Sequence, residues 1–361
     1  MRTMNMAIVG LGNMGNTHRM IITGAGEWYD VPIGGAIENL NLMGSFDIRE
    51  ERQQFARDNG LRAYASLEEL LADPDIDFIT CATPNDVHKE VAMQAMRAGK
   101  GVVCEKPITL SSCDLQEMID VSVETGSLLT AHQNRRWDDD YATIRKIIAD
   151  GLLGEVFRIE SRVPNASGGP GGWRAKPEHG GGYLLDWGVH ILDQALYMIP
   201  GKVRRVYARL TNLIQQEVDD GFYVELEFEN GLVYYLEGGT SSFIELPRWN
   251  ILGVNGTAVI DDFHVNGRMV RVAERSRRNP QEVQLACGGT RSFAVRRGFP
   301  NVTEPIPVAR ADVRDFYRNV AAACAGEAEL IVKPEQIMRV MKLMEAVRES
   351  SKAKSSILFE E

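Results

Sequence analysis

Asp186 and His190 are the pair of residues in this chain best suited to moving a proton. They are four positions apart in Tyr183–Ile199, a segment whose pattern predicts a helix, so both side chains are expected on one helix face. An imidazole titrates near neutral pH and can take a proton from a hydroxyl group, and an adjacent carboxylate would orient it. The alternative is an ordinary aspartate near a helix N-terminus beside a packed histidine. Asp193 lies on the same stripe and fits a structural role equally well.

Lys106 is a further candidate for chemistry because it follows a predicted strand, Gly101–Cys104. Open α/β sheets bind ligands beyond the carboxyl ends of their strands. A lysine there can donate a hydrogen bond to a ligand hydroxyl, and its charge lowers the pKa of a nearby acid or alcohol. Most lysines are instead solvated surface residues, but Pro107, directly after the strand-ending Glu105 and Lys106, disfavours that interpretation here.

A glycine motif stands between the first predicted strand, Met6–Val9, and a predicted helix. It reads Gly10, Leu11, Gly12, Asn13, Met14, Gly15, which is GxGxxG in the context that the motif requires. The first glycine allows a tight turn, the second lets the backbone approach a pyrophosphate, and the third lets helix and strand pack closely. The helix N-terminus then binds the phosphates. The motif predicts a dinucleotide-binding site, with a plain tight turn as the alternative.

Asp47 indicates which dinucleotide is bound. It ends the second predicted strand, where a carboxylate accepts hydrogen bonds from an adenosine ribose and repels a 2′-phosphate. Arg49, two residues later, could instead pair with such a phosphate, and a helix-capping role for Asp47 is a further alternative. The pattern favours NAD over NADP.

The first third of the chain alternates strands with helices, which predicts right-handed βαβ units and a doubly wound parallel sheet. Gly24–Leu40 fits this scheme least well and is interpreted as a loop or an insertion. The predicted strands are Met6–Val9, Leu42–Phe46, Asp77–Ala82, Gly101–Cys104 and Ser127–Ala131, and the predicted helices are Asn13–Thr23, Glu50–Asn59, Asn85–Ala98 and Ser111–Thr125.

The second half is dominated by strands, and two of its joints are Asn-Gly pairs, Asn230-Gly231 and Asn255-Gly256, which favour hairpins. An open, mainly antiparallel sheet with a few helices is expected. We therefore predict a Rossmann domain over residues 1–130 and an α+β domain for substrate and oligomerisation over residues 131–361, with a last helix able to pack back on the first domain. The predicted strands are Val156–Val163, Val203–Leu210, Phe222–Phe228, Leu232–Glu237, Ile251–Val254 and Thr257–Asp261, and the predicted helices are Asp139–Asp150, Tyr183–Ile199, Ala311–Ala325 and Pro334–Lys352.

Composition limits the classes of function. The 361 residues include 40 lysines and arginines against 50 aspartates and glutamates, and this net charge of −10 argues against nucleic acid or an acidic membrane surface as a partner. The five cysteines form no CxxC pair, so we expect reduced thiols and no metal. No apolar run approaches the ~20 residues of a membrane helix, and the first residues lack a signal-peptide pattern. The expected location is the cytoplasm.

Several further motifs occur in a characteristic order. The chain resembles the glucose–fructose oxidoreductase / inositol dehydrogenase / rhizopine-catabolism (Gfo/Idh/MocA) family over nearly its whole length, and the Glu-Lys-Pro triplet and the Asp-x-Gly-x-His helix are the specific parts. The motifs are Cys81-Ala82-Thr83-Pro84-Asn85 with His88, Cys104-Glu105-Lys106-Pro107, Asn134-Arg135-Arg136, Gly180-Gly181-Gly182 with Asp186, Gly188, His190 and Asp193, and the helix Glu345–Ser351.

The resemblance implies roles for these residues. Lys106, Asp186 and His190 would be catalytic, and the Trp173-Arg174 pair would lie near the cofactor or the substrate entrance. The contacts implied for the cofactor come from Gly10, Gly12, Asn13, Met14, Gly15, Asp47, Thr83, Pro84, Asn85, His88, Glu105, Lys106, Asn134, Trp173 and Arg174. His132, Gln133 and Arg135 could line the same pocket.

Seven of the fifteen residues in Gly168–Gly182 are glycine, which is more than the family pattern suggests. A loop of this kind just before the catalytic helix could fold over cofactor and substrate, or it could be a disordered surface loop. His18 and His264 are interpreted as surface or packing residues. Arg275–Arg278 and Arg296-Arg297 are interpreted as solvated loops, with contacts to a subunit partner or a polar substrate as alternatives.

Together with these observations, the resemblance implies an NAD-dependent dehydrogenase that reversibly oxidises a secondary ring hydroxyl of a sugar, a glycoside (for instance at C3) or an inositol. In this mechanism His190 takes the hydroxyl proton, Asp186 supports His190, and Lys106 polarises the oxygen. A homodimer or homotetramer formed through the second sheet is expected. Two alternatives are an NAD-dependent glycosidase, which acts through transient oxidation and elimination, and a non-catalytic dinucleotide sensor.

Overall fold

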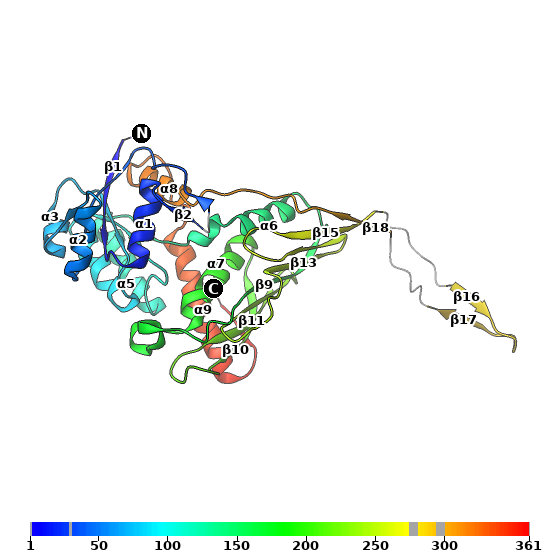
Figure 1. The fold of residues 1–361 in the computed structure, drawn as a ribbon. Helices are drawn as coiled ribbons and strands as arrows, with labels where there is room; N and C mark the ends of the chain where they lie inside the picture. Colours follow the sequence, from blue (N-terminus) through cyan, green and yellow to red (C-terminus); the bar gives the residue numbers. More distant parts are fainter. Residues whose placement is uncertain (1, 29–30, 274–280, 294–299, 361) are drawn as a thin grey trace.

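Short apolar runs form the strands of a six-stranded parallel sheet in the first part of the chain (Figure 1). We analysed a computed structural model, which describes residues 2–28, 31–273, 281–293 and 300–360. The central strands are buried on both faces, as expected for a parallel sheet covered by helices. The order is β5-β4-β1-β6-β7-β8, formed by β1 (Met4–Val9), β4 (Leu40–Phe46), β5 (Arg62–Ala63), β6 (Phe78–Cys81), β7 (Gly101–Cys104) and β8 (Leu129–Ala131).

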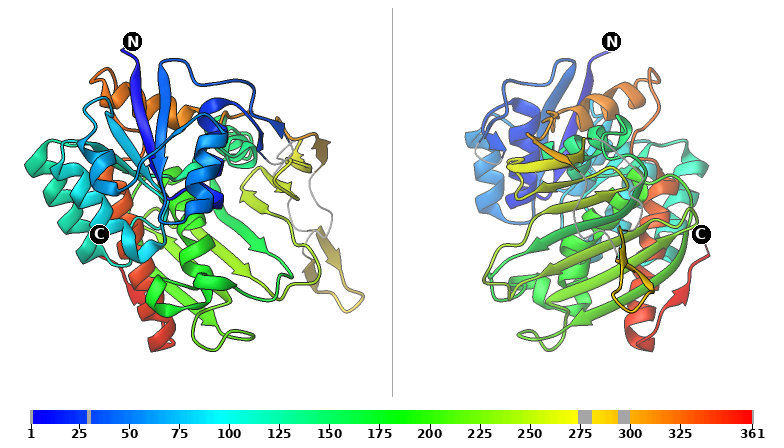
Figure 2. Two further views of the ribbon diagram at one scale, coloured as in Figure 1. Left: turned by 60° about the vertical axis from the view of Figure 1, so that its left-hand side comes forward. Right: turned by 90° about the vertical axis from the view of Figure 1, so that its right-hand side faces the viewer.

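Helices cover both faces of this sheet (Figure 2). Ser66 and Ser111 cap two of them by accepting hydrogen bonds from the backbone N–H groups of Glu69 and Asp114. The predicted alternation is confirmed, although the sequence analysis missed β5 and the six-residue helix α3. The helices are α1 (Asn13–Thr23), α2 (Glu50–Asp58), α3 (Leu67–Ala72), α4 (His88–Arg97) and α5 (Ser112–Thr125), with a 3₁₀ turn, η1, at Asn85–Val87.

A nine-stranded sheet occupies the second part, and all its neighbouring strands are antiparallel except β9 and β12. Alternate residues of β11 and β12 are buried, so one face packs on helices while the other stays uncovered (Figure 2, right). The predicted fold class is therefore confirmed. The order is β18-β15-β14-β13-β9-β12-β11-β10-β19, formed by β9 (Val156–Pro164), β10 (Val203–Thr211), β11 (Gly221–Phe228), β12 (Val233–Gly239), β13 (Trp249–Gly253), β14 (Gly256–Ile260), β15 (Gly267–Val272), β18 (Asn301–Glu304) and β19 (Ile357–Leu358).

The predicted helix Tyr183–Ile199 begins as a π-helical turn, η5 (Leu184–Gly188), and continues as α7 (Val189–Met198). Such turns are frequent at functional sites. Gly188 is in close contact here, since a Cβ on it would lie 2.6 Å from the side chain of Leu184. The other helices are α6 (Asp139–Ala149), α8 (Asp315–Cys324) and α9 (Pro334–Ala353), and the other 3₁₀ turns are η2 (Asn134–Trp137), η3 (Gly172–Ala175) and η4 (Pro177–His179).

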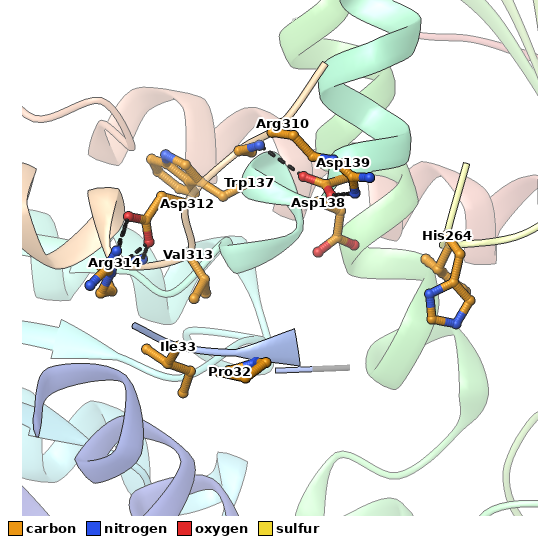
Figure 3. Close-up of a pocket in the computed structure, with 12 residues that line it drawn as sticks. Pro32, Ile33, Trp137, Asp138, Asp139, His264, Arg310, Asp312, Val313 and Arg314 are labelled. Atoms are coloured by element: carbon orange, nitrogen blue, oxygen red, sulfur yellow. Dashed lines mark hydrogen bonds and ion pairs between the residues drawn. The ribbon is translucent and has the colours of Figure 1, made fainter. Parts of the chain in front are cut away.

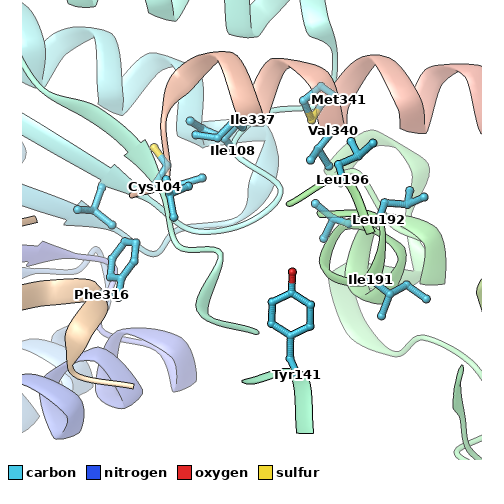
Figure 4. Packing of buried hydrophobic residues seen from close by; sticks show 14 of the residues in the cluster. Cys104, Ile108, Tyr141, Ile191, Leu192, Leu196, Phe316, Ile337, Val340 and Met341 are labelled. Atoms are coloured by element: carbon cyan, nitrogen blue, oxygen red, sulfur yellow. The ribbon is translucent and has the colours of Figure 1, made fainter. Parts of the chain in front are cut away.

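Helix α9 joins the two parts of the molecule. Its N-terminal half packs against α7, where Val340 and Met341 lie near Leu196 (Figure 4). The Glu345 carboxylate accepts hydrogen bonds from the backbone and hydroxyl groups of Ser112 on α5, both 2.7 Å long. Further along α9, the Ser350 hydroxyl accepts from a backbone N–H of β10 at 2.9 Å. The last helix therefore contacts α5 of the first part of the molecule and both α7 and β10 of the second part.

Two small hairpins stand outside the sheets. β2 (Glu27–Trp28) and β3 (Val31–Pro32) pair within the predicted insertion, and β16 (Gln281–Gln284) and β17 (Thr290–Phe293) pair far from the nine-stranded sheet (Figure 1). The arginines at 275–278 and 296–297 lie outside the described residues. Among the described helices, none combines the length and the apolar character that crossing a membrane requires.

Candidate active site

The glycine motif forms a turn with space above its centre. Gly10 has φ +90°, and a Cβ on it would lie 2.7 Å from a backbone oxygen, while a Cβ on Gly15 would lie 2.1 Å from the oxygen of Gly10. Around Gly12, by contrast, such an atom would meet only the Arg49 guanidinium, 3.7 Å away. Gly12 also precedes α1 without a side-chain cap, so the first amides of this helix face the same space. This cradle fits a pyrophosphate.

Asp47 lies beside this turn and is buried. Its carboxylate accepts hydrogen bonds from the backbone N–H of Leu11 at 2.8 Å and from that of Arg49 at 3.0 Å. The first of these bonds ties the end of β4 to the glycine turn. The carboxylate is therefore held next to the phosphate cradle, where the sequence analysis expected it.

Lys106 and Asp186 form the centre of a second cluster, at the carboxyl end of β7. The Lys106 ammonium donates to the Asp186 carboxylate at 2.9 Å and to the backbone oxygen of the same residue at 2.8 Å. The Arg174 guanidinium reaches the same carboxylate oxygen at 3.3 Å. Burial raises the pKa of Asp186, but the charges of Lys106 and Arg174 outweigh this effect and hold the pKa below its ordinary value. Asp186 is therefore ionised at neutral pH.

His190 is buried, with 5% of its surface exposed. Burial, and after it the charges of Lys106 and Arg135, hold the pKa of His190 well below its ordinary value, so the ring is neutral at pH 7. Its Nδ1 atom has no hydrogen-bond partner among the described residues. Nor do those residues show a hydrogen bond between His190 and Asp186. The sequence predicted that the Asp186 carboxylate pairs with the His190 imidazole. In the structure this carboxylate instead accepts hydrogen bonds from the cations of Lys106 and Arg174.

Asp193, on the same helix, is paired with Arg136. The guanidinium donates to both carboxylate oxygens, at 2.6 and 2.7 Å, and both side chains are only 2% exposed. Arg136 also donates to the side chain of Gln336 and to the backbone of Ile331. These bonds anchor α7 to η2 and to the start of α9, which is the structural role considered for Asp193.

Arg136→Met is expected to lower the free energy of unfolding by about 3–5 kcal/mol, because it leaves the Asp193 carboxylate buried without its cation. Urea denaturation followed by circular dichroism measures the loss. Arg318→Met is the matched control, since Arg318 pairs with Asp312 and Asp315 at the surface and should contribute about 0–1 kcal/mol. Equal losses in the two variants would contradict this assignment.

Comparisons with known proteins agree with this geometry. Residues 4–133 match the oxidoreductase family with an NAD-binding Rossmann fold, and residues 141–259 match the GFO/IDH/MocA C-terminal domain. The scyllo-inositol 2-dehydrogenase (NADP(+)) of Bacillus subtilis is 31% identical over 307 residues, which are 81% of this chain and 82% of that one. The chain belongs to the Gfo/Idh/MocA family. It is therefore an oxidoreductase with a domain for binding NAD or NADP.

Two further relatives of this Gfo/Idh/MocA protein are informative. The myo-inositol 2-dehydrogenase of Thermotoga maritima is 27% identical over 72% of this chain and 75% of that one. The crystal structure of an NAD-binding protein from Listeria innocua superimposes with a TM-score of 0.87 at 37% identity, over 99% of this chain and all of that one. The fold is thus shared over essentially the whole chain.

The glycine-rich segment of this family member lies beside Lys106. Arg174 reaches Asp186 as described, its guanidinium stacks 4.4 Å from the ring of Trp173, and the Asn85 amide donates to the backbone oxygen of Gly180 at 3.2 Å. Together with Lys106 these residues enclose only a very small cavity. The structure thus brings Trp173, Arg174 and Asn85 together with Lys106 and Asp186, while their expected contacts with cofactor or substrate stay predictions. Whether the segment opens and closes remains a prediction.

Other predicted cofactor contacts have protein partners in this structure. The ring nitrogens of His88 lie 2.9 Å from the backbone oxygen of Thr83 and 3.0 Å from that of Pro107, so this histidine links the two loops that follow β6 and β7. Asn134 is buried in η2, directly after β8. The expected contacts of these residues, and of Pro84, Asn13 and Met14, with a cofactor stay predictions.

Sequence reasoning missed a buried network behind Lys106. The Glu105 carboxylate accepts hydrogen bonds from His18 on α1 at 2.9 Å and from His132 after β8 at 2.8 Å, both at the same oxygen. Tyr317 on α8 lies 2.7 Å from the other ring nitrogen of His18 and 2.8 Å from the Thr80 hydroxyl. His18 is therefore a core residue with polar partners. The only signal in the sequence was that His132 and Glu105 each end a predicted strand.

A separate cavity of about 470 Å³ lies between β3, η2 and the segment before α8 (Figure 3). Asp138 lines it and accepts a hydrogen bond from Arg135 at 3.0 Å. Burial raises the pKa of Asp138 to about 7, against the opposing charge of Arg135. The Arg135 guanidinium also stacks 4.7 Å from Trp187 and 5.5 Å from Phe263. Arg135 thus joins this cavity to the turn that carries Asp186.

Proposed function

We propose that this protein is an NAD-dependent dehydrogenase that reversibly oxidises a secondary ring hydroxyl of a sugar, a glycoside or a cyclitol to a ketone. The observation that carries the proposal is the meeting of Lys106, at the carboxyl end of β7, with η5 and α7, which present Asp186 and His190. After burial, the charge of Lys106 is the largest influence that lowers the pKa of His190, so a cation lies near a neutral imidazole.

The residues have distinct tasks in this reaction. His190, neutral at pH 7, accepts the hydroxyl proton of the substrate. Lys106 donates a hydrogen bond to the same oxygen and stabilises the negative charge that develops on it. Asp186 holds the Lys106 ammonium in place through its carboxylate and its backbone oxygen. The bound nicotinamide supplies the acceptor for the hydride that leaves the carbon, so one proton and one hydride are removed and a C=O bond forms.

The substrate class is supported by the relatives. Two of them are named as inositol dehydrogenases, and a third, 31% identical over 58% of this chain, is the 1,5-anhydro-D-fructose reductase of Ensifer adhaerens. All three names describe ring polyols or their ketones. We therefore infer a polyhydroxylated ring as the substrate, with inositols and pyranoses (including glycosides oxidised at C3) as the two leading groups.

A substrate screen tests this function. Free sugars, glycosides and inositols are offered with NAD and with NADP, and the absorbance of the reduced cofactor is followed, after a spectrum of the purified protein has shown any cofactor carried along. Net reduction of the cofactor by a ring polyol supports the proposal. Release of an aglycone without net reduction would point to a glycosidase, and cofactor binding without turnover of any substrate would point to a sensor.

The preference for NAD follows from Asp47. Its buried carboxylate next to the cradle would repel a 2′-phosphate, so we expect kcat/KM for NAD to exceed that for NADP by about tenfold or more. Asp47→Ser should reduce this ratio by about tenfold, measured with both cofactors at a fixed substrate concentration. Glu51→Gln is the matched control, because Glu51 is an exposed acid that, like Asp47, forms an ion pair with Arg49. A wild-type protein that uses NADP equally well would contradict the prediction.

We also propose a homodimer or homotetramer in the cytoplasm, built through the uncovered face of the nine-stranded sheet. Three tyrosines, Tyr207, Tyr223 and Tyr235, lie side by side on neighbouring strands of that face, with ring centres 6.1 to 6.5 Å apart. Aromatic side chains in such a row are typical of protein interfaces. The division of the chain at residue 130 is likewise our proposal.

A further inference from the structure

Residues 172–179, which form the turns η3 and η4, lie directly over Lys106. The cavity that they leave beside Lys106 and Asp186 has a volume of about 10 Å³. A cavity of this size holds at most about one water molecule, whereas sites for small organic ligands have volumes of roughly 300–1,000 Å³. A polyhydroxylated ring therefore does not fit between this segment and the Lys106 ammonium in the arrangement that the structure shows.

Few contacts hold this segment in place. None of the residues in η3 and η4 is buried. Nδ1 of His179 lies 3.0 Å from the Asp86 carboxylate on η1, and the Asn85 amide donates to the backbone oxygen of the residue after His179 at 3.2 Å. Arg174 reaches the Asp186 carboxylate at 3.3 Å. Because partly exposed polar contacts contribute little free energy and the segment buries no apolar side chain, it can leave this position at a low cost in free energy.

Both ends of the segment are tied to loops of the nine-stranded sheet. Before it, the backbone oxygen of Pro170 accepts a hydrogen bond from the Gln215 amide at 3.1 Å. After it, the backbone N–H of Tyr183 donates to the backbone oxygen of Asp219 at 2.8 Å. The intervening residues are all glycines, at position 171 before the segment and at positions 180–182 after it. The segment thus lies between two fixed points, each followed by residues whose backbone rotates freely.

Two backbone hydrogen bonds mark the closed position. The N–H of Gly181 donates to the carbonyl oxygen of Lys176, and the N–H of Gly182 donates to that of Arg174, both at 3.0 Å. These bonds join the segment to the glycines that precede η5. They are lost when the segment moves away and kept when it stays, so these two N–H groups report its position.

We propose that residues 172–179 are a lid that must open for the substrate to reach Lys106, and that the contact of His179 with Asp86 is the latch that holds the lid closed. The latch joins the lid to the first part of the molecule and lies apart from the Lys106 cluster. Opening also breaks the ion pair of Arg174 with Asp186. The inference rests on the proposed function only in placing the substrate at Lys106.

Trypsin measures the opening of the lid. The peptide bond between Arg174 and Ala175 is the only one in the lid that trypsin cleaves, because Lys176 is followed by Pro177. Cleavage follows the fraction of molecules whose lid is open. In His179→Ala, which lacks the latch, we therefore expect cleavage at this bond to be roughly three- to tenfold faster than in the wild type, measured by mass spectrometry of the two fragments.

Glu178→Gln is the matched control, since Glu178 is exposed and lies beside His179 in the same lid. Its cleavage rate should stay within about twofold of the wild type. The urea midpoint should be the same in both variants, because the lid has no buried residue. Cleavage of His179→Ala at the wild-type rate, or an equal rise in the two variants, would overturn the latch.

Acetylation of Lys106 tests access to the site without a substrate. The Lys106 side chain is 12% exposed, against 30% for Lys89 on the outer surface, so sulfosuccinimidyl acetate should modify Lys106 slowly in the wild type. In His179→Ala, Lys106 should react faster by the same factor as the trypsin cleavage, while Lys89 should react at its wild-type rate. Peptide mass spectrometry measures both. Unchanged acetylation of Lys106 beside faster cleavage would mean that the opening does not lead to Lys106, which would overturn the lid.

Hydrogen exchange locates the hinge. The N–H groups of Gly181 and Gly182 are released when the lid opens, but those of Tyr183 and Leu184 stay bound to the loop between β10 and β11, at 2.8 and 2.6 Å. His179→Ala should therefore speed exchange at the two glycines alone. Equal acceleration at all four positions would mean that the start of the helix unfolds, which would overturn the lid. None of the three measurements needs a substrate, so failure of the lid and failure of the proposed function can be told apart.

Discussion

Lys106→Met is expected to lower kcat for oxidation of the substrate by about 10²–10³-fold, while the affinity for NADH changes by less than about threefold. The ammonium is the charged donor at the carboxyl end of β7, and methionine keeps the apolar stem but removes the charge. The loss should appear in kcat because the hydrogen bond to the substrate oxygen strengthens as negative charge develops on that oxygen. Steady-state kinetics and NADH fluorescence titration measure the two quantities.

A variant of Asp186 provides a second test of this prediction. In Lys106→Met the Asp186 carboxylate keeps only Arg174, so its pKa rises from the lowered value. If Asp186 acts by holding Lys106, then Asp186→Asn should lose activity alone but add little to Lys106→Met, and the two losses should be far from additive. Additive losses would instead give Asp186 an independent role.

Lys89→Met is the control for Lys106. Lys89 also forms ion pairs with carboxylates, those of Asp114 and Glu117, but it lies on the outer surface of α4 and α5. Its replacement should leave kcat within about twofold of wild type. If Lys106→Met kept activity equal to that of Lys89→Met, the assignment of Lys106 to the reacting oxygen would be wrong.

The elements of the fold were predictable where the local pattern is strong. Buried parallel strands such as Gly101–Cys104 read as continuous apolar runs, and the Asn-Gly turns marked two hairpins of the second sheet correctly. Among the elements that were not predicted, β5 and α3 are two and six residues long and too short to show a period. The π-helical turn before α7 was not predicted, because the apolar pattern of the sequence indicates a helix but not which hydrogen bonds its first turn forms.

The sequence predicted which residues come together at the candidate site better than it predicted which of them form hydrogen bonds with each other. The spacing of Asp186 and His190 suggested that they interact, yet Asp186 pairs with Lys106 from β7 and Arg174 from η3. Helical spacing places two side chains on one face, but it says nothing about competing cations from other elements. The Glu105 network was not predicted for the same reason, because its residues come from α1, β7, α8 and the segment after β8, which meet only in the folded protein.

His190→Ala is expected to lower kcat by about 10²–10⁴-fold, because no other base then accepts the hydroxyl proton. NADH affinity should change little. The pH dependence carries the mechanistic information. The pKa of His190 lies well below its ordinary value, so the wild-type rate of oxidation should be flat through neutral pH and fall only in the acid range, as the ring becomes protonated.

The variant should behave differently with pH. Without the imidazole, the proton must leave to solvent, so the residual rate of His190→Ala should keep rising with hydroxide concentration and show no acid limb from this group. His264→Ala is the matched control, since His264 is exposed and should leave both the rate and the profile unchanged. An acid limb that persists in His190→Ala would assign the base to another residue, and normal turnover in this variant would exclude His190 from the chemistry altogether.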